Sequence, residues 1–97
     1  MKIGSLLGGQ HDPIEKKMQI LKEIAGAKII YKAFQTDDRM PPHTNPTDVF
    51  VTVLSGKMEI TVEGESNIFG SGDFIYFPAN AVHELLCMEE SKILIIK

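Results

Sequence analysis

Short runs of alternating apolar and polar residues dominate the second half of the chain. Residues 58–63 alternate strictly, and residues 49–54 form a β-branched and aromatic run that stops at Ser55-Gly56. Alternation with a period of two buries one face of a strand, and a Ser-Gly break between two such runs predicts a hairpin. Turn residues separate further short runs at 66–69, 74–77, 82–88 and 93–96. This spacing predicts an all-β sandwich or barrel.

The N-terminal region is less regular. Residues 1–12 are rich in glycine and show no period, so we expect a loose or docking arm ahead of a single barrel domain over residues 13–97. For the stretch 13–25 two interpretations stay open. One is an amphipathic first helix with Asp12 as its N-cap. The other, which we favour because barrel edges need partners, is a strand pair over 18–21 and 28–35.

Composition narrows the class of partner. The chain has 97 residues, 43% of them apolar, a net charge of −3 and no Trp. Without a basic cluster it is not expected to bind nucleic acid, and its apolar runs are too short for a signal peptide or a membrane span. Cys87 is the only cysteine, so no internal disulfide forms and a cytoplasmic location is expected. A domain this small gains stability by pairing, which predicts a homodimer.

Two segments combine histidines with turn residues at fixed spacing. The first contains His43, Asn45, Val49 and Gly56, and the second contains Gly72, Pro78, Asn80, His83 and Cys87. Together they resemble the paired motifs of the cupin superfamily, of the small cupin 2 conserved-barrel type. In the first motif His43 and Gly56 match, while Asn45 stands in the second histidine position and Val49 in the glutamate position. In the second motif Gly72, Pro78 and His83 match, with Asn80 replacing a glycine and Cys87 an asparagine.

The resemblance implies an all-β, cupin-type double-stranded β-helix, or jelly-roll barrel, with a short helix or strand arm at its N-terminus. It also implies a pocket where metal-dependent cupins hold a divalent transition metal with three histidines and one glutamate. Of these four ligands only His43 and His83 remain, and Asn45 offers a weak amide oxygen. His43, Asn45 and His83 are therefore the candidate metal site, and we favour a pocket without metal.

Asp48, Cys87 and His11 are further candidates for the same pocket. Asp48 points to the opposite face from His43 in a regular strand, so it reaches the pocket only if a bulge near Pro46 reverses its direction. Cys87 alternates in phase with His83 and is expected to face the interior as a small hydrophobe, with a reactive Cys–His pair as the alternative. The third histidine, His11, lies in the N-terminal arm and is expected to be solvated.

Three functions fit these observations. The preferred hypothesis is a small cupin-barrel protein that binds a small-molecule ligand in its pocket, with its specific activity left open. The alternative is a metal-dependent enzyme of the dioxygenase or isomerase type with a reduced two-histidine site. The third is a metal-free binder of a sugar or small acid that uses His43 or His83 as an acid–base group, since the pKa of histidine lies near neutrality. The sequence assigns no catalytic residue and no organic cofactor.

Overall fold

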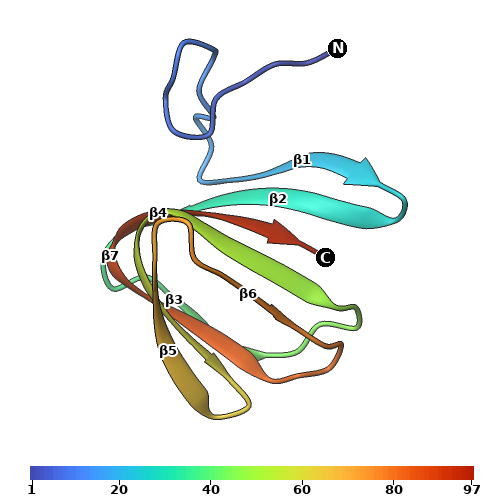
Figure 1. Cartoon of the computed structure of the whole chain (residues 1–97), viewed down its shortest axis with the longest axis vertical. Helices are drawn as coiled ribbons and strands as arrows, with labels where there is room; N and C mark the ends of the chain where they lie inside the picture. Colours follow the sequence, from blue (N-terminus) through green and yellow to red (C-terminus); the bar gives the residue numbers. More distant parts are fainter.

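A computed structural model describes all 97 residues and contains seven strands and no helix (Figure 1). All pairings between strands are antiparallel. The strands are β1 (Met18–Ile24), β2 (Ala27–Phe34), β3 (Arg39–His43), β4 (Val49–Val62), β5 (Glu65–Gly70), β6 (Phe74–Phe77) and β7 (His83–Ile96). The predicted all-β jelly-roll barrel is confirmed. No helix of the structure is long and apolar enough to cross a membrane.

Two long strands hold the barrel together. β4 and β7 have 14 residues each and pair along most of their length, and the order of the main sheet is β1-β2-β7-β4-β5. In the first layer, the N-terminal half of β4 pairs with β6 and the C-terminal half of β7 pairs with β2, which carries β1. In the second layer, the other halves pair with β5 and β3. Figure 1 shows β4 and β7 passing from the end near β1 and β2 to the end near β5.

The predicted hairpin at Ser55-Gly56 is wrong, because β4 continues through this point as a single strand. The register shifts here instead, between Val53 and Met58, and the strand bends from one layer into the other. Gly56 has φ 93°, and a Cβ on it would lie 2.2 Å from Ser91 Oγ and 2.3 Å from the Glu90 carbonyl oxygen. Glycine is therefore required where these two paired strands approach each other most closely. The runs predicted at 82–88 and 93–96 are likewise halves of one strand, β7.

For the stretch 13–25 the strand interpretation is confirmed and the helix is wrong. β1 and β2 are joined by Ala25-Gly26, both with positive φ (50° and 82°), as in a type I′ hairpin turn. Residues 1–17 contain no strand, only an isolated bridge between Ser5 and Pro13. The proposed division of the chain into an arm and a barrel at residue 13 stays a prediction.

The core lies between the two layers and is built from alternate residues of β4 and β7. Val51, Val53, Ile60 and Ile93 are at most 3% exposed, because each points inward from a pleated strand. They belong to a cluster of 14 buried apolar residues. The cluster fills the barrel except at one mouth, where polar side chains replace apolar ones.

Candidate functional site

Two histidines face each other at this mouth. His43 ends β3 and His83 begins β7, and the antiparallel register places them directly opposite one another. Their ring centroids are 4.1 Å apart with the planes inclined at 60°. His83 is 5% exposed and also packs on the Phe77 ring, with centroids 4.5 Å apart, whereas His43 is half-buried. The structure thus brings together the two histidines that the motifs predict.

Each ring is oriented by a hydrogen bond between its Nδ1 atom and the backbone carbonyl two residues earlier. His43 Nδ1 lies 2.7 Å from the Pro41 carbonyl oxygen, and His83 Nδ1 lies 3.0 Å from that of Ala81. A carbonyl oxygen only accepts hydrogen bonds, so in each neutral ring Nδ1 carries the proton and Nε2 keeps its lone pair. In each case the carbonyl belongs to the residue two positions earlier: Pro41 precedes His43 in β3, and Ala81 follows the turn at Asn80 and precedes His83. Two adjacent rings therefore each retain an Nε2 acceptor.

Burial keeps His83 in its neutral form. Desolvation is the main cause that lowers the pKa of His83 from its ordinary value, and the charges of His43 and Lys97 lower it further. The hydrogen bond to Ala81 opposes this shift only in part. At neutral pH this imidazole is therefore a hydrogen-bond acceptor toward the pocket.

Asn45 completes the polar part of the mouth. Its side-chain Nδ2 donates to Thr47 Oγ1 (2.7 Å) and to the Thr47 carbonyl oxygen (3.3 Å), which leaves Oδ1 free to accept. Its own carbonyl oxygen accepts a hydrogen bond from the Asn80 N–H at 2.8 Å. Asn80 has φ 68°, the left-handed conformation that glycine adopts readily and that Asn tolerates better than other residues. The bond between Asn45 and Asn80 ties together the loops that precede β4 and β7.

The rest of the lining decides how well a metal fits. The cavity is small, ≈ 30 Å³, and its other lining residues are apolar apart from one lysine: Met40, Val49, Val51, Phe77, Leu85, Ile95 and Lys97. Val49 is 4% exposed in the position where the resemblance implies a carboxylate. The structure nowhere brings three His, Cys, Asp or Glu side chains together as a metal site. A metal centre with three histidines and one glutamate therefore does not fit. Only the two imidazoles and the Asn45 side-chain oxygen could act as metal ligands.

Asp48 does not compensate for the missing carboxylate. Its Oδ1 accepts a hydrogen bond from the Ala79 N–H at 3.0 Å, and the residue is not part of the cavity lining. Asp48 instead fixes the loop between β6 and β7. The alternative in which a bulge turns Asp48 into the pocket is wrong.

Cys87 and His11 also lie outside the cavity. Cys87 is fully buried, as predicted, and its Sγ donates to the Glu89 carbonyl oxygen at 2.9 Å. Burial raises the pKa of this thiol, which keeps it protonated, so Cys87 serves as a core residue. His11 is exposed in the N-terminal segment.

Sequence reasoning missed Lys97, which lines the same cavity. The β4–β7 register pairs Phe50 with Ile96, so its next position sets Val49 opposite Lys97. Lys97 follows Ile93 and Ile95 in the alternation, so it lies on the cavity side of the strand end, where it stays exposed to solvent. In the sequence, only this alternation indicates that Lys97 lies on the cavity side. It can be interpreted once the strand that pairs with β7 is known.

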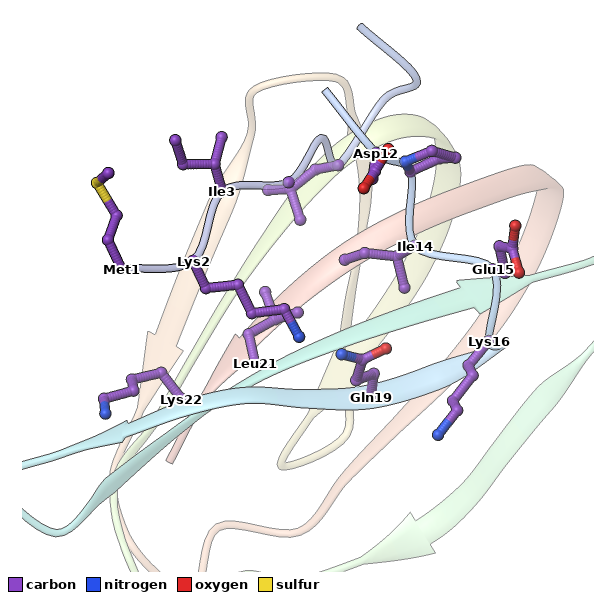
Figure 2. A pocket seen from close by; sticks show the side chains of 13 residues that line it. Met1, Lys2, Ile3, Asp12, Ile14, Glu15, Lys16, Gln19, Leu21 and Lys22 are labelled. Carbon is purple, nitrogen blue, oxygen red and sulfur yellow. The ribbon is translucent and has the colours of Figure 1, made fainter. Parts of the chain in front are cut away.

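A second hollow lies between the N-terminal segment and β1. An open groove of ≈ 1130 Å³ separates the N-terminal segment from β1 (Figure 2). Ile14 and Leu21 line it together with Lys2, Lys16 and Lys22, whose side chains are mixed with those of Asp12 and Glu15. The charged residues of this groove are exposed, whereas the small cavity is lined by two adjacent imidazoles and by Asn45. Ligand sites combine apolar walls with a few convergent polar groups, so we place the candidate site at the small cavity.

Fold and site together define a small jelly-roll barrel with a two-histidine pocket. The sequence matches the Cupin_2 family model, described as a cupin domain, over residues 31–96, and the chain belongs to this family. An RmlC-like cupin from Desulfovibrio desulfuricans is 20% identical and superimposes with a TM-score of 0.81, covering 99% of this chain and 94% of that one. No curated protein matches the sequence.

Two further solved structures show how broadly this fold is used. A conserved protein of unknown function from Streptococcus pyogenes is 27% identical, with a TM-score of 0.75 over 86% of this chain and 75% of that one. A salicylate 1,2-dioxygenase from Pseudaminobacter salicylatoxidans is 11% identical, with a TM-score of 0.70 over 72% of this chain and 20% of that one. The second likeness shows the fold alone, so the activity of this chain has to be argued from its own pocket.

Proposed function

We propose that this cupin binds a small molecule in the barrel mouth, against His43, Asn45 and His83. The observation that carries the proposal is the pair of Nδ1 hydrogen bonds to backbone carbonyls, which leaves two adjacent Nε2 lone pairs open to a ligand. The free Oδ1 of Asn45 adds a third acceptor. A ligand that donates hydrogen bonds satisfies all three, and the apolar wall formed by Val49 and Phe77 receives its carbon atoms.

The proposal is a binding role and assigns no reaction. A nucleophile would need an activated thiol or hydroxyl in the cavity, and the single thiol, Cys87, is buried outside the lining. His83 can exchange a proton with a bound ligand, but no carboxylate of the lining orients it as a general base. The acid–base role of the histidines therefore stays secondary to binding.

A thermal-shift screen of small metabolites against protein freed of metal with chelator tests this proposal. We expect compounds that donate hydrogen bonds to raise the melting temperature of the wild type. The His83→Gln variant should lose the effect, while His11→Gln, which removes an exposed histidine, should keep it. If no compound stabilises the wild type, or if each does so equally in His83→Gln, the pocket is not the binding site.

A weakly bound divalent metal is the second candidate, as in metal-dependent cupin enzymes. The same three lone pairs favour it, since neutral imidazoles and an amide oxygen can hold a transition metal. Val49 and the nearby positive charge of Lys97 oppose it. When bound, such a metal would supply Lewis acidity at the barrel mouth.

Elemental analysis of protein loaded with iron, manganese, nickel or zinc and then desalted decides between the two candidates. We expect far less than one metal ion per chain. Close to one ion per chain in the wild type, lost in His43→Ala but kept in His11→Ala, would favour the enzyme.

We also propose that the chain forms a homodimer through the outer face of its first layer. Phe50 and Phe74 stack there, with ring centroids 5.6 Å apart, and Phe74 and Tyr76 are 57% and 74% exposed. Exposed apolar patches of this kind mark protein contacts. Light scattering should give a dimer that Phe74→Glu dissociates. Ile68→Glu, which changes an exposed apolar residue on β5, should leave the dimer intact.

For location we propose the cytoplasm. The basis is the single free thiol of Cys87, which needs no oxidising compartment.

A further inference from the structure

Glu63 lies in the turn that joins β4 to β5, outside the cavity lining. It is followed by Gly64, and both residues have positive φ (49° and 78°), as the two central residues of a type I′ hairpin turn do. Asn, Asp and Gly are the usual residues at the first of these positions, because they tolerate the left-handed backbone best. The turn alone therefore does not account for a glutamate here.

The side chain and the backbone of Glu63 both bind Val82, the residue that precedes His83. The Oε1 atom of Glu63 accepts a hydrogen bond from the Val82 N–H at 2.8 Å. The N–H of Glu63 donates to the Val82 carbonyl oxygen, also at 2.8 Å. The two segments meet because the β4–β7 register sets Val62 opposite His83. Glu63 thus holds both backbone groups of the residue that leads into the histidine.

The Val82 N–H belongs to the same peptide group as the Ala81 carbonyl. In a trans peptide the N–H and the C=O point in opposite directions within one plane. The Glu63 carboxylate accepts from the N–H on one side, and on the other side the carbonyl oxygen accepts from Nδ1 of His83 at 3.0 Å. A continuous chain of hydrogen bonds therefore runs from the carboxylate through the peptide to the imidazole. Such chains polarise each member, which makes the Ala81 oxygen a stronger acceptor.

His43 has no equivalent support. Its Nδ1 binds the carbonyl oxygen of Pro41, and the nitrogen of that peptide group belongs to Pro42 and carries no hydrogen. No carboxylate can therefore act on this carbonyl through an N–H. The two histidines that face each other in the pocket differ in this respect, although each binds a carbonyl oxygen two residues earlier in the chain.

Resting on the proposed function, we propose that Glu63 is a positioning residue for His83. Acting through the Ala81–Val82 peptide, its carboxylate holds the His83 ring in the tautomer with the proton on Nδ1, which keeps the Nε2 lone pair free for a ligand. The hydrogen bond at one ring nitrogen sets which nitrogen is protonated. The effect is electrostatic and orientational, and no proton moves through the peptide. Glu63 is exposed, whereas the ring at the other end of the chain is 5% exposed, where hydrogen bonds are stronger.

The tautomer of each ring in ligand-free protein, measured by long-range proton–nitrogen NMR correlations, tests this role. Glu63→Ala should shift the tautomer ratio of His83 about two- to tenfold toward a proton on Nε2, the range expected for the net contribution of one hydrogen bond. The His43 ratio should not change and serves as an internal reference. Glu65→Ala, which removes an exposed carboxylate at the start of β5, is the matched control and should leave both rings unchanged.

Two further variants separate positioning from the stability of the turn. Glu63→Gln keeps an oxygen acceptor on a side chain of the same length, so it should retain most of the wild-type ratio at His83. Glu63→Asn suits the positive φ better than glutamate, but its side chain is one methylene shorter. It should therefore keep the turn and still shift the His83 ratio as Glu63→Ala does, which also covers the case in which Glu63→Ala does not fold.

Three results would overturn the inference. They are an unchanged His83 ratio in Glu63→Asn, an equal shift in Glu65→Ala, and an equal shift at His43, which would indicate a general loosening of the pocket. Because the measurement needs no ligand, its failure is distinct from that of the proposed function. An unchanged His83 ratio beside compounds that bind through His83 would overturn the inference alone. A ratio that depends on Glu63 in a protein that binds no compound would overturn the proposed function alone.

Discussion

The close approach of β4 and β7 at Gly56 makes a sharp prediction about stability. Gly56 has φ 93°, and an added Cβ would meet Ser91 Oγ at 2.2 Å, the Glu90 carbonyl oxygen at 2.3 Å and Ser91 Cα at 2.7 Å. Two of these atoms belong to the backbone of β7, so a side-chain rotation cannot relieve the clash. The Gly56→Ala variant should therefore force the two strands apart where each passes between layers.

The magnitude follows from two contributions. Placing alanine at positive φ costs about 1–2 kcal/mol, and overpacking a close contact adds about 1–3 kcal/mol. The sum, about 2–5 kcal/mol, is a large part of the 5–15 kcal/mol typical of a domain. Gly64→Ala is the matched control, because Gly64 also has positive φ (78°) but a Cβ there meets nothing within 4 Å. Gly64→Ala should therefore be destabilised only by the positive φ, by about 1–2 kcal/mol.

Urea denaturation followed by circular dichroism measures both variants. At about 4–8 °C per kcal/mol for a domain of this size, the Gly56→Ala variant should also melt roughly 8–40 °C below the wild type. If Gly56→Ala fails to fold, the Gly64→Ala result still has to show a small loss for the steric reasoning to hold. Equal stability of the two variants would refute it, since the clash with β7 would then cost nothing.

Three further predictions concern single side chains around the site. The folded-state pKa of His83 is lowered below its ordinary value of 6.5, so the unfolded state binds more protons as pH falls through 6.5. Stability should decline there in the wild type, and the decline should flatten in His83→Gln when both are measured by urea titration. Asp48→Ala should cost about 1 kcal/mol through loss of the bond to the Ala79 N–H, with ligand binding unchanged by NMR titration. Cys87, fully buried, should react with a thiol reagent only after denaturation, and rapid labelling of the native protein would contradict the core role given to it.

Local patterns in the sequence were enough to predict the class of fold. Alternation over residues 58–63 and the turn residues after each short run led to an all-β barrel, and the motif spacing led to the cupin family. The prediction of a turn at Ser55-Gly56 failed because a glycine at a close contact between paired strands and a glycine in a hairpin turn look alike in sequence. What distinguishes them is the contact with Ser91, a residue 35 positions further along the chain.

The site was predictable only in part. The spacing of the two motifs predicted that His43 and His83 share one pocket, and the β3–β7 register sets them opposite each other. The tautomer of each ring depends on the path of the preceding backbone, which the sequence does not specify. Lys97 enters the cavity through the register of β7 against β4, a long-range property that local pattern cannot supply.

The tautomeric state of His43 and His83 in the native protein tests the central claim most directly. Long-range proton–nitrogen NMR correlations distinguish a protonated Nδ1 from a protonated Nε2 in each neutral ring. The account predicts that both rings carry the proton on Nδ1 and that the Nε2 resonances move when a ligand binds. A proton on Nε2 of both rings would contradict it, because the pocket would then present donors in place of the two lone pairs on which the proposed binding depends.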